Sequence, residues 1–359
     1  MHSVSSFRRG PRAKDHILDL DVLEPGDIVL STTGEAVSRS IRFLTNSPYS
    51  HAMLYVGNTL IHADGGGVFS LNPQRKIVGQ GEIAVYRLRE RPDDVAMTAV
   101  INHARNEIGC LYSVPHALLV GVMKLWGRDR SGKQFCSRLV AQAYHQAGHP
   151  LVRNPDYCSP GALARSTRLA PVEHALRPVN DVDLRIAATT DQLLVHQHQT
   201  FEWLRWVRSA ARRKGHRISR FNSALDFIQA HPDVDEEAAR QLQACGYLQH
   251  YLVDESANAY RYSCDAFIDH CGPTDHAIAQ ELKIARDMAA RVISAHRGAA
   301  LRPATRTFAL LRELHRNRAG QLVRRLDVIQ AVAARHGLLA MAGSAHALKT
   351  QLLPAMRAT

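Results

Sequence analysis

Two segments of the sequence contain residue types that could act together as a nucleophile and a base. Cys136 lies in KQFCSRLVAQAYHQAG, near the start of a predicted helix, and His51 lies in SPYSHAMLYVG, at the start of a predicted strand. A thiol in the first turn of a helix is close to unpaired backbone amides and to the positive end of the helix dipole, which favour the thiolate. A neighbouring imidazole can accept the thiol proton and later protonate the leaving group. We therefore predict that Cys136 is a nucleophile and His51 is its base.

A third polar group usually orients the histidine in sites of this kind. His62 in the segment LIHAD is the best-placed candidate, because an adjacent strand can bring it to the far nitrogen of His51. Asp64 is the second candidate, although its position before three glycines is more typical of a turn residue. The backbone amide of Cys136 itself could help to bind a tetrahedral oxyanion.

The elements around these residues predict an α+β domain over residues 21–182. LEPGDIVLST, SHAMLYVGN, TLIHAD and IAVYRLR have the patterns of short strands, and glycines or prolines close most of them. Apolar residues recur at helical spacing over residues 35–46, 93–109, 116–127 and 133–148. Residues 1–20 have the composition of a basic polar tail.

The second half of the chain has a helical pattern throughout, which predicts an all-α accessory domain over residues 190–359. We take residues 179–192 as the linker between the two domains. Of the formal net charge of +12, residues 185–359 contribute +8. This excess permits an anionic partner such as nucleic acid or a membrane surface, but composition does not choose between them.

The order of the motifs resembles the permuted papain-like cysteine hydrolases of the YiiX/YaeF type, which are related to the NlpC-type peptidases and to lecithin:retinol acyltransferase. GDIVL, SPYSHAMLYVG, LIHADGGGV, a segment with Gly109 and Tyr112, FCSRLVAQAYHQAG and CSPGALARS follow one another in the order of that family. In the permuted group the histidine segment precedes the cysteine segment, as it does here. The resemblance covers about residues 23–170 and does not extend into the second half.

This resemblance implies a permuted papain-like, NlpC-like fold in which Cys136 is the nucleophile and His51 the base. The third polar position of the family is commonly a glutamate, whereas this sequence has His62 there. A neutral imidazole is a weaker partner for an imidazolium than a carboxylate is. The departure therefore affects the orienting group and leaves the nucleophile–base pair unchanged.

The other cysteines and histidines do not indicate a metal site or a disulfide framework. The six cysteines are irregularly spaced, and we expect Cys110, Cys158 and Cys245 to be buried as small apolar residues. The cysteine and histidine residues between 264 and 276 fit no standard set of four zinc ligands. We therefore expect no metal and no cofactor.

The start of the sequence has basic residues but no apolar core behind them, and no run approaches the roughly eighteen apolar residues of a membrane span. We therefore expect a cytoplasmic protein.

We predict that the first domain is a cysteine hydrolase that cleaves an amide bond through an acyl-enzyme. Peptides, N-acyl amino acids and lipid-like substrates are all compatible with the resemblance. The alternatives are a lipid acyltransferase, thioesterase or phospholipase that uses the same two residues, a non-catalytic binding module, and a basic adaptor for nucleic acid or an anionic membrane. The helical domain is expected to cover the site, to bind a protein partner or to self-associate.

Overall fold

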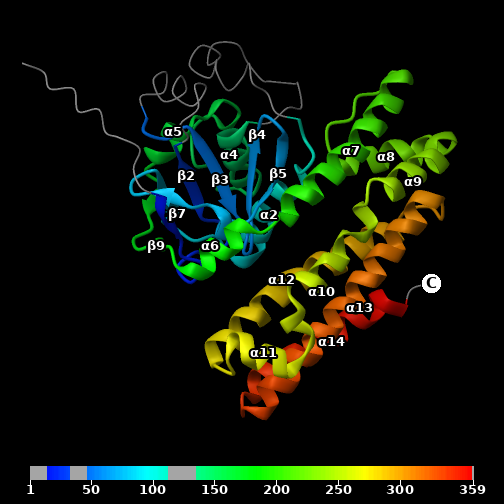
Figure 1. Cartoon of the computed structure of the whole chain (residues 1–359). Helices are drawn as coiled ribbons and strands as arrows, with labels where there is room; N and C mark the ends of the chain where they lie inside the picture. The colour runs from blue at the N-terminus through cyan, green and yellow to red at the C-terminus, as the bar shows by residue number, and fades with distance from the viewer. Residues whose placement is uncertain (1–13, 33–46, 112–134, 358–359) are drawn as a thin grey trace, which may run out of the picture. The chain divides into compact units, whose positions relative to one another are not determined.

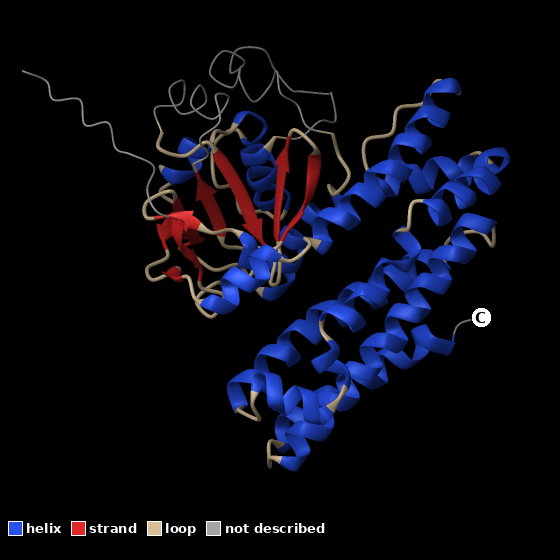
Figure 2. Cartoon of the chain, viewed as in Figure 1, coloured by secondary structure: helices blue, strands red, loops and turns tan. Residues whose placement is uncertain are grey.

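The computed structural model describes residues 14–32, 47–111 and 135–357. The chain divides into two compact units. Unit 1 comprises residues 1–197 with Ser219–Asn222, and unit 2 comprises His198–Ile218 with Ser223–Thr359. Among the described residues every strand lies before residue 180, and unit 2 is helical (Figure 2). The predicted α+β class with a helical second half is confirmed.

Unit 1 is built on a six-stranded antiparallel sheet with the strand order β5-β4-β3-β2-β7-β8 (Figure 1). The strands are β2 (Ile28–Ser31), β3 (His51–Tyr55), β4 (Leu60–Asp64), β5 (Gly67–Leu71), β7 (Ile83–Leu88) and β8 (Leu169–Pro171). A second sheet has the order β6-β1-β9, from β1 (Lys14–Leu18), β6 (Val78–Gly79) and β9 (Leu176–Pro178). The short 3-10 turns are η1 (Pro73–Arg75) and η2 (Pro155–Tyr157).

Each face of the larger sheet carries its own apolar core, because side chains alternate along a strand. Ala52 and Leu54 of β3 face α2 (Asp94–Asn106) and α4 (Cys136–Gln146), whereas Met53 and Tyr55 belong to the core on the opposite face. Two shorter helices, α5 (Pro160–Ala164) and α6 (Asp181–Ala188), complete the described part of unit 1.

An ion-pair network fixes the turn that leads into β2. Asp27 is fully buried and accepts two hydrogen bonds from Arg87 of β7, at 2.7 and 2.8 Å. Arg87 also pairs with Glu24, at 2.7 Å. A bidentate arginine–carboxylate pair of this kind has a strict geometry, so the turn and β7 are held in a fixed relation.

The turn itself depends on Gly26, which has a φ of +101°. Its carbonyl oxygen accepts a hydrogen bond from the hydroxyl of Tyr144 in α4, and a Cβ atom at this position would lie 2.5 Å from Cε of Met97 in α2. The Pro-Gly-Asp turn therefore connects the sheet to the helix that begins at Cys136.

Two of the boundaries predicted from the sequence need correction. Strand β1 lies inside the predicted tail of residues 1–20, because Ile17 and Leu18 are buried and pair with β9. The predicted linker contains α6, which begins with a capping box formed by Asn180 and Asp183. Two helices predicted at residues 35–46 and 116–127 lie outside the described residues.

Unit 2 contains a core formed by three long helices, α12 (Asp275–Ala300), α13 (Arg306–Arg335) and α14 (Leu339–Arg357), together with α11 (Cys264–Cys271). Its other elements are most of α7 (Gln192–Arg213), most of α8 (Phe221–Ala230), η3 (Pro232–Val234), α9 (Asp235–Ala244), η4 (Tyr247–Leu252), α10 (Val253–Ala257) and η5 (Ala259–Tyr262). The core positions recur every three or four residues along α12 and α13, which is the spacing that the sequence pattern predicts.

Candidate active site

Cys136 is the first residue of α4, and its side chain is 4% exposed. The residue before it, Phe135, is the N-cap of the helix. Its side chain accepts no hydrogen bond from the backbone amides of the first turn. Sγ of Cys136 lies 4.0 Å from the carbonyl oxygen of Ser50 and also contacts the backbone of Ala52. The thiol is therefore placed against the backbone on both sides of His51.

Burial raises the pKa of the Cys136 thiol, and hydrogen bonds from the backbone of Ala52 and from Ser137 reduce this effect only in part. The position of Cys136 at the start of a helix, taken alone, predicts that the thiolate is favoured. In the structure, the loss of hydration outweighs the backbone amides, so the resting group is a neutral thiol.

His51 and His62 form a pair on neighbouring strands. Nε2 of His51 lies 2.9 Å from Nδ1 of His62, and the two rings are almost perpendicular, at 87°. The strand register explains the contact: Met53 of β3 is directly opposite His62 of β4, which places His51 diagonally across from His62 on the same face. The ring of His62 is also in edge contact with Phe69 of β5.

Both imidazoles are neutral at physiological pH. Burial lowers the pKa of His51 well below its ordinary value, and His62 and Lys76 add to the effect. Burial and the charge of Lys76 lower the pKa of His62 to about 3. The site therefore holds a neutral thiol and neutral imidazoles, not a thiolate–imidazolium ion pair.

The hydrogen bonds of the described residues do not join Sγ of Cys136 to the ring of His51. The alternation of side chains along β3 is the reason: Ala52 faces the core beneath α4, and His51 faces away from Ala52 toward His62. The structure thus brings the ring of His51 to His62, and it places the thiol of Cys136 next to the backbone of Ser50 and Ala52, which flank His51.

The contact between the two rings occupies Nε2 of His51 and leaves Nδ1 as the nitrogen that can act as a base. Nε2 of His62 is buried and has no hydrogen-bond partner among the described residues. If Nε2 of His51 donates its proton to Nδ1 of His62, Nδ1 of His51 keeps the lone pair that a base requires. The opposite arrangement would place the proton on Nδ1 of His51 and remove its basicity.

Asp64, the second candidate for orienting His51, has a local role. Its carboxylate accepts a hydrogen bond from the backbone of Gly66 at 2.8 Å, within the turn between β4 and β5. This is the turn contact that its position before the glycines predicts.

Sequence reasoning missed two polar neighbours of the histidine pair. Ser31 lies directly opposite His51 in the register of β2 and β3, is 1% exposed, and its Oγ is buried without a hydrogen-bond partner among the described residues. Lys76 follows η1 and places a positive charge near both rings. Neither residue lies in a recognisable motif, because each reaches the site through strand pairing or a turn.

The remaining cysteines agree with their predicted structural roles. Cys110, Cys158 and Cys245 are buried, whereas Cys264 and Cys271 are half-buried on α11. Over the described ranges of the chain, no group of three or more histidine, cysteine or acidic residues is arranged to hold a metal ion.

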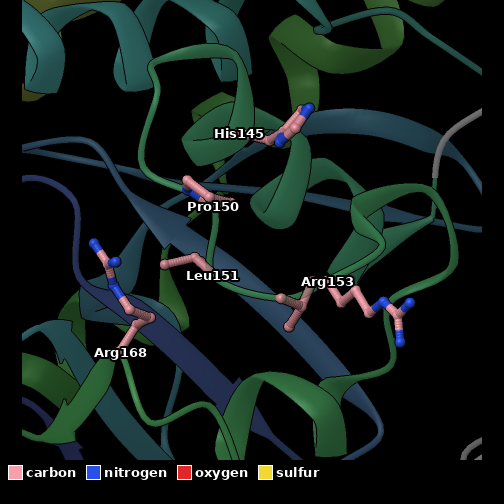
Figure 3. A pocket seen from close by; sticks show the side chains of 6 residues that line it. His145, Pro150, Leu151, Arg153 and Arg168 are labelled. Carbon is pink, nitrogen blue, oxygen red and sulfur yellow. The ribbon is translucent and has the colours of Figure 1, made fainter.

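A shallow hollow of about 440 Å³ lies at the other end of α4, about nine residues from the thiol along the helix. It is lined by His145, Pro150, Leu151, Val152, Arg153 and Arg168. Figure 3 shows that the side chains of His145, Arg153 and Arg168 point in different directions and do not converge on one point. We therefore do not assign a substrate to this hollow.

Residues 22–165 match the family model described as permuted papain-like amidase enzyme, YaeF/YiiX, C92 family. This segment is therefore similar to the permuted papain-like amidases. The resemblance predicted from the order of the motifs is confirmed over the matched residues, and the family is one of hydrolases that act on amide bonds. The match ends at Arg165, directly after α5, so unit 2 lies outside it.

Comparison with solved structures finds the crystal structure of metalloprotein yiiX from Escherichia coli O157:H7. The identity is 16%, the match covers 42% of this chain and 96% of that chain, and the TM-score is 0.28. No curated protein matches this chain.

None of the helices that the structure describes combines the length and the apolar composition that a bilayer span requires.

Proposed function

We propose that the amidase domain cleaves an amide bond of a peptide or an N-acyl amino acid, with Cys136 as nucleophile, His51 as base and His62 as the residue that positions His51. The observation that carries the proposal is the placement of the Cys136 thiol against the backbone flanking His51, whose Nε2 is already engaged by His62. Only Nδ1 of His51 is then left to receive the thiol proton.

In the first half of the reaction, His51 takes the proton of Cys136 while Sγ attacks the carbonyl carbon of the substrate. In this proposal the resulting oxyanion binds to backbone N–H groups at the start of α4, including that of Cys136, since no side chain caps this end of the helix. The tetrahedral intermediate then expels the amine, which receives its proton from the imidazolium of His51. The product of this half is a thioester between Cys136 and the acyl group.

In the second half, His51 removes a proton from water, and the hydroxide formed attacks the thioester carbonyl. Release of the acid returns the proton to Sγ, so the enzyme ends in its neutral thiol–imidazole state. An acyltransferase would differ only in this half, with another nucleophile in the place of water. Water is the acceptor we favour, because it needs no second binding site.

The contribution of His62 differs from that of the glutamate common in the family. A neutral imidazole holds the ring of His51 through one hydrogen bond but adds no negative charge to stabilise the imidazolium. We therefore infer that His62 positions His51 without raising its basicity.

The test uses four single variants of the full chain: Cys136→Ala, His51→Gln, His62→Gln and, as a matched control, Cys158→Ala. The control removes a buried thiol of the same core that is not next to His51. Each is assayed against N-acyl amino acid anilides and short peptide anilides, and hydroxylamine is added to trap the acyl-enzyme.

Cys136→Ala is expected to abolish turnover and trapping, and His51→Gln to lower kcat by roughly 10²- to 10⁴-fold. His62→Gln should lower kcat by a smaller factor, and Cys158→Ala should retain activity. Turnover that survives Cys136→Ala would refute the proposed nucleophile. Transfer of the acyl group to an added amine in preference to water would favour the acyltransferase alternative.

A further inference from the structure

Two histidines of unit 2 have their rings in contact beyond the ends of two consecutive helices. His216 follows α7 and His231 follows α8, 15 residues later in the chain. Nε2 of His216 lies 3.2 Å from Nε2 of His231, and the two ring centroids are 4.8 Å apart. Both residues lie outside the segment 22–165 that matches the amidase family, so this contact is separate from the site of Cys136.

The backbone of each histidine is held by the end of the helix that precedes it. Gly215 has a φ of +78°, which reverses the chain after α7, and the N–H of His216 donates to the carbonyl oxygen of Ala211 at 2.9 Å. The N–H of His231 donates to the carbonyl oxygen of Ile228 in α8 at 3.2 Å. The two rings therefore start from fixed positions of the main chain.

Contacts around the pair join the same two segments of the chain. Lys214 lies two residues before the first histidine and Asp233 two residues after the second, and Nζ of the lysine is 2.7 Å from the carboxylate. The ring of Phe227 in α8 packs against both imidazoles, with its centroid 5.7 Å from that of His216 and 4.6 Å from that of His231. The imidazoles are thus brought together by contacts other than the one between them.

The separation of the two Nε2 atoms is close to that of two ligands of one metal ion. In a tetrahedral site, imidazole nitrogens lie about 2.0–2.1 Å from zinc, which places two of them about 3.3 Å apart. The observed separation is 3.2 Å, at a position that is open to solvent. In the part of the chain that the structure describes, neither imidazole has another hydrogen bond or an ion pair, so both Nε2 atoms are available to one ion.

We propose that His216 and His231 bind one divalent transition-metal ion, such as Zn²⁺, through their Nε2 atoms. Neutral imidazole is a ligand that zinc, copper and nickel ions prefer, whereas magnesium and calcium ions prefer oxygen. In the metal-bound state each ring carries its proton on Nδ1, from which it can donate to water. The chain supplies two ligands, and water or a ligand from outside the chain occupies the remaining positions.

The pair lies away from the cysteines and histidines between 264 and 276, whose spacing predicts no metal. Spacing along the chain does not predict the pair, because the fold joins His216 to a residue 15 positions later. Without a metal, one Nε2 atom must donate its proton to the other, and the rings are joined by a single hydrogen bond. The two states are distinguishable, because only a chelating pair binds a metal ion saturably and loses this binding when either histidine is replaced.

The test measures binding of Zn²⁺ to the full chain by isothermal titration calorimetry in a reducing buffer without chelators. The variants are His216→Ala, His231→Gln, the double variant and the control His346→Ala. His346 is an exposed histidine of α14, and among the described residues no second imidazole contacts it. Cysteine thiolates can also bind zinc, so the readout is the binding event that a histidine substitution removes.

We expect each single variant to lose one zinc-binding event or to weaken it by roughly tenfold or more, and His346→Ala to retain it. The double variant should lose no more than either single variant, because both residues hold the same ion. His216 is exposed, so His216→Ala keeps the test valid if His231→Gln disturbs the packing on Phe227. Zinc binding that His216→Ala leaves unchanged, an equal loss in His346→Ala, or a further loss in the double variant would overturn the proposal.

Discussion

Nε2 of His51 lies 2.9 Å from Nδ1 of His62, so the proposed base is held by a second imidazole where the family commonly has a carboxylate. The pair is largely withdrawn from water, and the positive charge of Lys76 acts on both rings. These conditions keep both rings neutral. They also make the protonation of the site sensitive to any negative charge placed at position 62.

Replacing His62 by glutamate is expected to change how readily Cys136 ionises. A carboxylate beside His51 stabilises the imidazolium, so His62→Glu should raise the pKa of His51 and favour transfer of the thiol proton to it. The alkylation rate of Cys136 by iodoacetamide at pH 6 should rise by roughly tenfold. His62→Gln, which adds no charge, should leave the rate near that of the unaltered protein. Equal rates in the two variants would show that position 62 does not influence the thiol.

The lowered pKa of His62 predicts a loss of stability in acid. Below pH 6.5, the ordinary pKa of histidine, the unfolded chain binds a proton at this residue that the folded protein does not bind until about pH 3. The free energy of unfolding should therefore fall as the pH decreases through this range, by about 2 kcal/mol at pH 5 from His62 alone. Urea unfolding at pH 7.5 and pH 5 measures the difference. His62→Phe keeps an aromatic ring at this position but has no group that binds a proton. The free energy of unfolding of this variant should therefore fall less between pH 7.5 and pH 5, by about 2 kcal/mol.

Gly26 should tolerate no side chain. Its φ is +101°, and a Cβ atom there would lie 2.5 Å from Cε of Met97 and 2.9 Å from the hydroxyl oxygen of Tyr144. Gly26→Ala is expected to lower the free energy of unfolding by about 2 kcal/mol, from backbone strain and displacement of α4. Gly65→Ala is the control, because nothing lies within 4 Å of a Cβ at that position. Thermal denaturation of the two variants tests whether Gly26→Ala is the less stable one. Similar melting temperatures would contradict the prediction.

The buried ion network of unit 2 predicts a large effect of Glu281→Gln. This substitution leaves Arg325 and Arg261 with one fewer negative charge in a site where Arg325 is 1% exposed. The free energy of unfolding should fall by about 3 kcal/mol, because an uncompensated charge remains buried. Asp265→Asn removes a carboxylate that is 92% exposed and pairs with Arg335 only at 4.0 Å, so it should change stability little. Chemical denaturation of both variants provides the comparison.

Much of the fold could be predicted from local patterns. The helix beginning at Cys136 and the strand beginning at His51 follow from apolar spacing and from the turns that border them. Strand β1 was missed because a five-residue strand among polar neighbours has no clear pattern of its own and is stabilised by pairing with β9. Helix α6 was missed because its short apolar pattern is weak, although the capping residues Asn180 and Asp183 were visible in the sequence.

The sequence by itself determined the residue types of the candidate site and the order of its parts, since these are properties of the chain alone. It placed a thiol at a helix start and a histidine at a strand start, and it ranked His62 ahead of Asp64 as the candidate to orient His51. Tertiary structure decided everything that depends on distance and burial. Strand register set the contact between His51 and His62, and burial raised the pKa of Cys136 against the effect of its helix position. Helix packing decided that Arg325 meets the carboxylates of Asp254 and Glu281, because spacing along one helix does not reveal what the neighbouring elements supply.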